Sequence, residues 1–244
     1  MAKSQIPVIK SSWGNNNSIP RQGKGWNVMA YLMGVLVGYG LGSINSAYFL
    51  ARMQGFDIRE RGSGNAGASN VVITLGRKKG LLCAVFDLTK AAVSVWLMAW
   101  LFPEINTFAV TASACILGHI FPFYLGFRGG KGLACLGGAI LAFNLRVFVA
   151  LLVFELFVVV VSRYICFVPI TASAVFPIIY GFMYQDMGGA FLLGGVGVVI
   201  FCKHLVNLRR IREGRELRLS YLWARDRETR RVEKQYRNSH ETKH

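Results

Sequence analysis

Long apolar segments with few charges are the feature of this sequence that most limits its fold. About 20 helical residues cross a hydrocarbon core roughly 30 Å thick, and seven stretches approach that length: 28–51, 81–102, 108–125, 133–145, 147–162, 167–184 and 190–206. The fourth and fifth are short, which leaves a re-entrant or broken helical pair open there. The pattern predicts an all-α integral membrane protein with about seven transmembrane helices and glycine-rich cytoplasmic loops.

Positive charge is concentrated in a few loops and near the C-terminal end, although the chain as a whole has a formal net charge of +16. Cytoplasmic loops of membrane proteins are rich in Lys and Arg, and counting the crossings places four basic segments on that side: 52–80, 126–133, 163–166 and 203–244. The basic N-terminal tail and Arg146 fall on the opposite side and do not fit this rule. Because topology accounts for most of the charge, no nucleic-acid partner is expected.

We expect three parts along the chain. Residues 1–25 have no apolar core followed by a cleavage site, so they are interpreted as a mobile N-terminal tail and not as a signal peptide. Residues 26–208 form the membrane domain, and residues 209–244 form a basic cytoplasmic tail that is solvated or attracted to anionic headgroups. Five cysteines lie in or beside apolar segments and are expected to be small core residues: Cys83, Cys115, Cys135, Cys166 and Cys202.

The stretch GSGNAGASN, from Gly62 to Asn70, has the G-x-G-x-x-G spacing of a dinucleotide-binding turn. That interpretation requires a preceding strand in a soluble βαβ unit, whereas a membrane segment precedes this loop. Glycines still expose backbone N–H groups to an anion, and donors and cations surround them: Ser63, Asn65, Ser69, Asn70, Arg59 and Arg61. The loop is therefore predicted to bind a phosphate, and the simpler alternative is a tight turn between helices.

A second glycine cluster, GFRGGKGLACLGG, places Lys131 between Gly130 and Gly132 at the start of an apolar segment. It is not a Walker A loop, because Leu125 stands at the first glycine position and Gly132 stands where Ser or Thr is required. A lysine among open N–H groups at a helix start nevertheless suits a phosphate. Two anion sites on one membrane face suggest two phosphorylated groups.

Four polar residues outside these loops are further candidates. His119 precedes the lysine loop, where a structural hydrogen bond is more common than catalysis, and His204 shares a helical face with Asn207. Glu155 lies inside an apolar segment, where ionisable residues are functional candidates by default. Two cysteines are weaker candidates for an acyl-carrying nucleophile, since no base is identified for them: Cys135 and Cys166.

Taken together and in order, five segments resemble the bacterial acyl-phosphate:glycerol-3-phosphate acyltransferases of the PlsY type: GSINSAYFLARMQGFDIRERGSGNAGASN, FDLTKA, GHIFPFYLGFRGGKGLA, RYICF and KHLVNLRRIREGRE. The similarity extends from about Gly42 to Glu216 and leaves the N-terminal tail and the last 28 residues outside. Several motifs in one order with matching spacing make a chance agreement improbable.

The resemblance implies a seven-helix, multi-pass enzyme of the bacterial plasma (inner) membrane, with its active site facing the cytoplasm. Members of the family transfer a fatty acyl group from acyl phosphate to the 1-hydroxyl of sn-glycerol 3-phosphate, which gives lysophosphatidate and phosphate in phospholipid biosynthesis. The reaction uses no cofactor, and no metal site or covalent acyl-enzyme is implied. The implied partners are the two substrates, membrane lipids and an upstream enzyme that forms the acyl phosphate.

Position by position, the resemblance assigns catalysis to Lys131, Ser63, His204 and Asn207. It assigns substrate binding to residues of both loops and their neighbours: Gly62, Gly64, Asn65, Ser69, Asn70, Arg59, Arg61, His119, Arg128, Gly129, Gly130 and Gly132. Supporting roles are expected for Asp57, Asp87 and Lys90, and also for Arg59 and His119 among the binding residues. Hydrogen bonds and positive charge would be directed at the transferred carbonyl and at the two phosphates.

The sequence also departs from the family pattern. Ile73 stands where a phosphate-binding arginine is expected. The missing arginine–phosphate contact would contribute about 1.5–3 kcal/mol to binding. One of three other arginines would have to supply this charge: Arg61, Arg77 or Arg128. Smaller departures are Ser69, Cys135, Cys166 and Pro169. They leave two alternatives, namely acyl transfer with another alcohol or donor, and a non-catalytic membrane scaffold. A transporter is disfavoured because the glycine loops lie at one face and not at the midplane.

Overall fold

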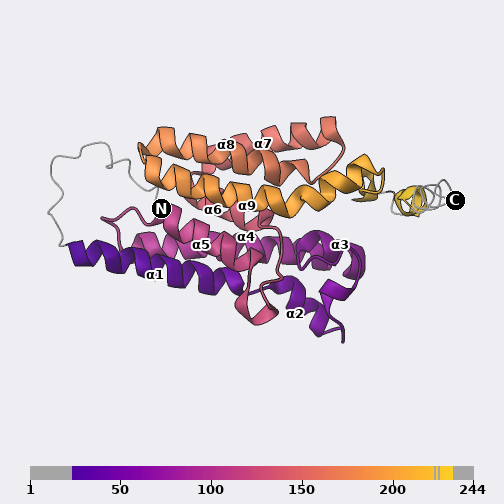
Figure 1. The fold of residues 1–244 in the computed structure, drawn as a ribbon, viewed down its shortest axis with the longest axis horizontal. Coiled ribbons are helices and arrows are strands. Elements are labelled where there is room, and N and C mark those ends of the chain that lie inside the picture. The colour runs from indigo at the N-terminus through magenta and orange to yellow at the C-terminus, as the bar shows by residue number, and fades with distance from the viewer. Residues whose placement is uncertain (1–23, 223, 225, 233–244) are drawn as a thin grey trace, which may run out of the picture.

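A computed structural model describes residues 24–222, 224 and 226–232 of the chain (Figure 1). The α-helices of this part are α1 (Lys24–Ser43), α2 (Ser46–Arg52), α3 (Ala68–Leu75), α4 (Arg77–Leu101), α5 (Phe108–Ile120), α6 (Leu133–Phe143), α7 (Leu145–Ser162), α8 (Phe167–Tyr184) and α9 (Met187–Arg212). Short 3-10 turns lie at Ile58–Glu60, Phe123–Leu125 and Leu219–Leu222. The long helices run side by side along the long axis of the molecule, as expected of a bundle that crosses a bilayer.

The predicted apolar segments are helices, and the predicted fold class is confirmed. Six helical segments of the described chain are long and apolar enough to cross a membrane, and α6 is a shorter apolar helix of 11 residues. The shortness of α6 agrees with the irregularity expected at the fourth segment, whereas α7 is a full helix of 18 residues. The last segment was predicted too short, because α9 continues past residue 206 to Arg212 and crosses the expected domain boundary at 208.

Two local features differ from the sequence-based expectation. The first segment, 28–51, is not one helix, because α1 ends at Ser43 and Asn45 caps a new helix, α2. Helix α3 was not predicted, since its eight residues follow the glycine loop without a long apolar stretch and lie between Gly67 and Gly76. The N-terminal tail expected at 1–25 lies outside the described residues up to residue 23, and residues 24 and 25 belong to α1.

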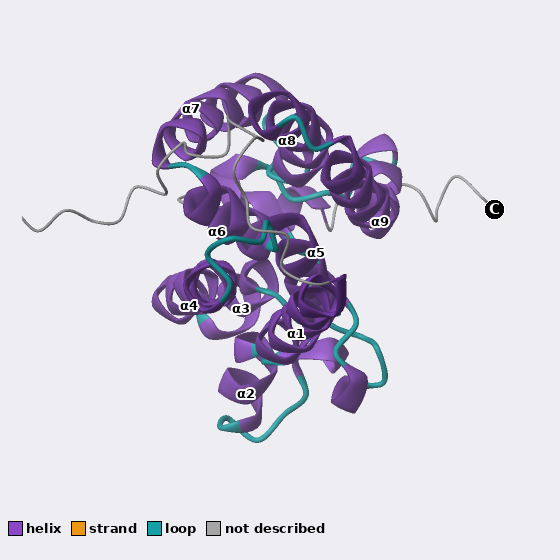
Figure 2. Ribbon diagram, turned by 90° about the vertical axis from the view of Figure 1, so that its left-hand side faces the viewer, coloured by secondary structure: helices purple, strands orange, loops and turns teal. Residues whose placement is uncertain are grey.

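Three glycines spaced four residues apart, Gly34, Gly38 and Gly42, let α1 lie directly against the backbone of α5. A Cβ on Gly38 would lie 2.5 Å from Thr111 O, and one on Gly42 would collide with the backbone of Cys115. Small residues at this spacing permit close helix packing in membranes. The two helices are accordingly neighbours in the end-on view (Figure 2).

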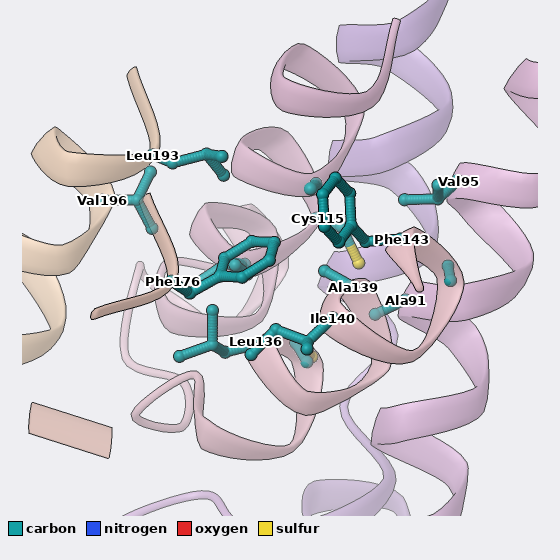
Figure 3. Packing of buried hydrophobic residues seen from close by; sticks show 14 of the residues in the cluster. Ala91, Val95, Cys115, Leu136, Ala139, Ile140, Phe143, Phe176, Leu193 and Val196 are labelled. Atoms are coloured by element: carbon teal, nitrogen blue, oxygen red, sulfur yellow. The ribbon is translucent and has the colours of Figure 1, made fainter. Parts of the chain in front are cut away.

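The apolar core lies around α5 and α6, which pack between α4 on one side and α8 and α9 on the other. Figure 3 shows Phe176 of α8 beside Leu193 and Val196 of α9, with Leu136 of α6 below Phe176 in this view. Aromatic rings continue the packing toward the end of α6: Phe108, Phe143, Tyr180 and Tyr184. Between membrane helices such contacts stabilise the bundle mainly by close packing.

The polar segments gather at one end of the bundle. α2, α3 and the described C-terminal segment lie at the same end of the molecule as the last turns of α9 (Figure 1). Arg59 Nη1 donates to Leu125 O at 2.6 Å, and Leu219 N donates to Arg163 O at 2.8 Å. The described parts of the four basic segments that were predicted to share one side therefore lie together.

Candidate active site

The two glycine-rich loops, residues 62–70 and 126–132, meet at this polar end. A Cβ added to Gly67 would lie 3.8 Å from Gly130 Cα, so the loops approach each other through glycine. The loops are far apart in the sequence, but the fold brings them together. Both loops were expected on one membrane face, and this arrangement agrees with that expectation.

Asn70 shapes the first loop. Its side chain is fully buried, its Nδ2 donates to Ile58 O and Arg61 O at 2.9 Å each, and its Oδ1 accepts from Ser63 N at 2.8 Å. An amide has two donor hydrogens and one carbonyl oxygen, so both donors are used inside the protein. Gly62 has a φ of +61° and a Cβ there would collide with Asn70 Oδ1. Asn70 is therefore placed to fix the loop, and its side chain does not point to an open site.

Three other side chains of the first loop have polar groups that are available to a ligand. In the part of the chain that the structure describes, Ser63, Asn65 and Ser69 are half-buried or exposed, and no protein hydrogen bond occupies their side chains. Gly64, with a φ of +75°, lies between the first two of them in a conformation that favours glycine. These groups are the ones that the first loop offers to a ligand.

Arg59 is held by the protein itself. It pairs with Asp57 through Nη2 and Oδ2 at 2.6 Å, and its other guanidinium edge donates to Leu125 O. The hydrogen bond from Arg59 lowers the pKa of Asp57 to about 2. Arg61 lies over the ring of Phe56, with 4.1 Å from Cζ to the ring centroid, and is exposed. Arg59 therefore joins the two loops, and neither arginine is aimed at an open phosphate site in this structure.

Asn45 is a site-shaping residue that the sequence analysis missed. It is fully buried, its Oδ1 accepts from Tyr48 N at 2.8 Å as the N-cap of α2, and its Nδ2 donates to Ala66 O at 3.0 Å. An asparagine directly before a helix start is a recognised capping signal. That signal was available in the stretch GSINSAYF, but it lay inside an apparently continuous membrane segment.

The second loop closes the C-terminal end of α5. Gly129 N donates to Ile120 O at 3.1 Å and Gly130 N donates to His119 O at 3.0 Å, which satisfies carbonyls that a helix end leaves open. A Cβ on Gly130 would collide with the His119 ring, and Gly132 has a φ of +88° as the N-cap of α6. The N–H groups of Gly129 and Gly130 are thus bonded within the protein, and the loop lies so close to His119 that only glycine fits at position 130.

Lys131 is the first member of a hydrogen-bonded chain of three side chains. Its Nζ donates to Asn207 Oδ1, and Asn207 Nδ2 donates to Glu216 Oε1 at 2.7 Å. Burial lowers the pKa of Lys131 and raises the pKa of Glu216, and the opposite charge of the partner counteracts both shifts. Two of the predicted catalytic residues are therefore in direct contact, and Glu216 is an addition that the sequence analysis did not single out.

His204 lies one turn before Asn207 on α9 and is buried. Its Nδ1 lies 2.8 Å from Ile200 O, and since a carbonyl only accepts, Nδ1 is the protonated nitrogen of this pair. The contact fixes the ring and leaves Nε2 for a substrate group. His204 and Asn207 share one face of α9, as their spacing predicts.

His119 is buried behind the second loop. Its Nδ1 accepts from Lys90 Nζ at 3.1 Å and lies 3.7 Å from Asp87 Oδ1. Lys90 in turn pairs with Asp87 at 2.8 Å and donates to Ile44 O at 2.6 Å. This polar cluster joins α4 and α5 to the α1–α2 junction and suits support of the second loop better than contact with a substrate.

The remaining candidate residues either lie away from the Lys131–Asn207–Glu216 chain or are buried and inaccessible to a substrate. Arg128 is exposed on the second loop, and Glu155 accepts from Thr171 Oγ1 at 2.7 Å between α7 and α8. Cys135 is buried in the core, and burial raises the pKa of the Cys166 thiol to about 11. The described residues contain no cluster of three or more His, Cys, Asp or Glu side chains that could hold a metal ion.

Comparison with known proteins gives a consistent result. Residues 32–214 match the glycerol-3-phosphate acyltransferase family. The glycerol-3-phosphate acyltransferase of Geotalea daltonii is 37% identical over 187 residues, which cover 75% of this chain and 94% of the relative.

Two crystal structures have the same fold. PlsY, an integral membrane glycerol 3-phosphate acyltransferase, superimposes in its glycerol 3-phosphate form with a TM-score of 0.71 at 30% identity, covering 79% of this chain and 97% of PlsY. Its lysophosphatidic acid form superimposes with a TM-score of 0.67 at 30% identity and covers 78% of this chain and 95% of PlsY.

Proposed function

This chain belongs to the glycerol-3-phosphate acyltransferase family, and we propose that it takes the acyl group from an acyl phosphate. It is a multi-pass membrane enzyme that transfers a fatty acyl group to glycerol 3-phosphate. The observation that carries the donor assignment is the contact of two glycine-rich loops beside Lys131. Such a site offers places for two phosphate groups, one on each substrate.

The proposed reaction is a direct transfer. The 1-hydroxyl oxygen of sn-glycerol 3-phosphate forms a bond to the carbonyl carbon of the acyl phosphate, and the bond from that carbon to the phosphate oxygen breaks. The phosphate leaves with the bonding electrons and takes the hydroxyl proton. The products are lysophosphatidate and inorganic phosphate, and the balance requires no further reactant.

The contacts support a role for each polar group. Lys131, which is half-buried and whose ammonium is oriented by Asn207, would neutralise phosphate charge as it develops. Ser63 and Asn65 would hold a second phosphate through donors that the protein leaves open. The ring of His204, fixed through Nδ1, would orient the acceptor hydroxyl through Nε2.

A covalent acyl-cysteine is not part of the proposal. Cysteine attacks as the thiolate, and burial raises the pKa of Cys166 to about 11, so this thiol stays protonated near neutral pH. Cys135 is fully buried in the core and its Sγ donates to Asp87 O at 3.5 Å. Neither cysteine has the low-pKa, accessible setting that nucleophilic catalysis needs.

The proposal includes the setting of the enzyme. We place it in the bacterial plasma (inner) membrane with the polar end in the cytoplasm, where the basic segments are expected. Residues 26–208 would be the catalytic membrane domain and residues 209–244 a basic tail. The acyl phosphate would enter from the bilayer, supplied by an enzyme that forms it.

The test uses the purified protein in lipid nanodiscs with palmitoyl phosphate and glycerol 3-phosphate, measuring phosphate and lysophosphatidate together. We expect equal amounts of both products, and Lys131→Ala should reduce kcat/KM by at least about 100-fold, as removal of a single transition-state donor does. Lys78→Ala, an exposed lysine at the start of α4, removes the same charge outside the site and is the control. Normal turnover by Lys131→Ala, or use of palmitoyl-CoA in place of palmitoyl phosphate, would contradict the proposal.

A further inference from the structure

The chain continues beyond residue 214, where the family match ends, and part of this continuation returns to the active site. After α9 the backbone turns at Gly214, which has a φ of +68°. The N–H groups of Arg215 and Glu216 both donate to Arg210 O, at 2.7 and 3.1 Å. The turn places Glu216 beside Asn207, whose Nδ2 donates to it.

The side chain of Arg231 binds the backbone of this turn. Its Nη1 donates to Gly214 O at 2.8 Å, and its Nη2 donates to Glu216 O at 2.7 Å. Its Nε donates to Glu228 Oε2 at 3.0 Å, and Glu228, which is buried, accepts from Ser220 Oγ at 2.8 Å through its other oxygen. All three guanidinium nitrogens of Arg231 are therefore used, two of them on the backbone that carries Glu216.

The same continuation is anchored to the membrane bundle. Leu219 N donates to Arg163 O at 2.8 Å, in the short connection between α7 and α8, and Tyr221 is buried. We use the name C-terminal clasp for the described residues from 213 to 232. The clasp contacts α9 through backbone bonds to Arg210 and through Glu216 and Asn207. It contacts the α7–α8 connection through Leu219, and Arg231 joins its own two ends.

We propose that Arg231 is a positioning residue for acyl transfer, which acts through Glu216 and Asn207 to hold Lys131 in place. Asn207 is a single amide between a cation and a carboxylate, so its orientation depends on where Glu216 lies. The backbone position of Glu216 depends in turn on two carbonyl contacts from Arg231. This inference rests on the function proposed above, because it needs Lys131 to bind a substrate phosphate.

Three variants test the proposal. Arg231→Ala removes the carbonyl contacts, Arg231→Lys keeps the charge but not the planar fork, and Arg227→Ala removes an exposed arginine of the same helical segment. In the assay with palmitoyl phosphate, Arg231→Ala should lower kcat/KM by about 10- to 100-fold, the usual effect of a small misplacement of a catalytic group. Arg231→Lys should lie between Arg231→Ala and the unchanged enzyme, and Arg227→Ala should stay within about twofold.

A second readout does not depend on turnover. Lys131 and Lys78 are labelled with an amine-reactive reagent in the folded full-length protein, and the ratio of the two is measured by mass spectrometry. Arg231→Ala should raise the Lys131:Lys78 ratio several-fold, because Lys131 loses its ordered partner, and Arg227→Ala should not change it.

The two readouts separate the possible failures. If Arg231→Ala and Arg227→Ala behave alike in both measurements, or if only the Tm falls while the labelling ratio stays constant, the positioning role is wrong. If the unchanged protein transfers no acyl group, the proposed function fails, and the labelling ratio still decides whether the clasp controls Lys131.

Discussion

Two groups of glycines that lie against α5, one in α1 and one in the loop after α5, use the same residue in two different ways. Along the side of α5, Gly38 and Gly42 of α1 lie against backbone carbonyls with no hydrogen bond between them. At the C-terminal end of α5, Gly129 and Gly130 donate their N–H groups to the last open carbonyls. The first contact joins two membrane helices, and the second fixes the loop that carries Lys131.

The two contacts use the same residue type, but one contributes only packing and the other also contributes hydrogen bonds. In a bilayer, a seam of glycines between two helices contributes by allowing close backbone packing. At the helix end, glycine allows close approach and also satisfies carbonyls that would otherwise be unpaired. We therefore expect substitutions along the side to reduce assembly of the protein, and substitutions at the end to reduce catalysis.

The largest effect on stability should come from Gly42→Ala. A Cβ at this position would collide with the backbone of Cys115, which cannot move as a side chain can. Overpacking of this kind costs about 1–3 kcal/mol or more, and the Tm measured by circular dichroism in detergent should fall by several degrees. Gly40→Ala is the matched control on the same helix, because a Cβ there has no neighbour within 4 Å. Equal Tm values for the two variants would show that the close packing of α1 on α5 does not stabilise the bundle.

An intermediate effect, seen in activity more than in stability, should follow from Gly130→Ala. The new Cβ would collide with the His119 ring, so either the ring or the loop must shift, and Lys131 with it. We expect kcat/KM to fall about 100-fold, which corresponds to about 2.7 kcal/mol, with a small change in Tm. Gly126→Ala in the same loop is the control, since its φ of +61° adds strain of about 1 kcal/mol but its Cβ meets no atom within 4 Å. A loss of Tm as large as that of Gly42→Ala would erase the distinction between the two glycine contacts.

The sequence predicted the parts of this molecule that depend on repeated local signals. Each membrane helix follows from a long apolar run, because a backbone in lipid must satisfy its own hydrogen bonds. The sequence also predicted that both glycine loops belong to one polar end. It could not separate glycines that bind an anion from Gly129 and Gly130, whose N–H groups close α5, because both uses give the same letters.

The remaining features depend on contacts between distant residues. Lys131 and Asn207 are 76 positions apart, and Arg231 and Glu216 are 15 positions apart. Asn45 breaks a membrane helix through a single capping side chain, a signal too short to outweigh the apolar run around it. Such pairings are decided by how helices pack, and a local pattern carries little information about them.

The smallest effect is expected for Ile73→Arg, and this variant tests which of the two loops binds the phosphate of glycerol 3-phosphate. The second loop supplies Lys131, whereas in the first loop Arg59 is paired with Asp57 and Arg61 lies over Phe56. Ile73 is half-buried on α3 and stands three residues after Asn70. An arginine at this position would lie on the same face of α3 as Asn70, which contacts the first loop. The variant thus adds a cation where the first loop has open donors but no arginine directed at them.

If glycerol 3-phosphate places its phosphate against the first loop, Ile73→Arg should lower KM for glycerol 3-phosphate by up to about tenfold, or about 1.4 kcal/mol, with kcat nearly unchanged. Ile73→Gln is the control, because it adds polarity and similar length without charge. Equal KM values for the two variants would mean that the added cation does not reach the phosphate. A higher KM for Ile73→Arg than for the unchanged enzyme would mean that the added side chain hinders the binding of glycerol 3-phosphate, which would contradict a phosphate site for this substrate at the first loop.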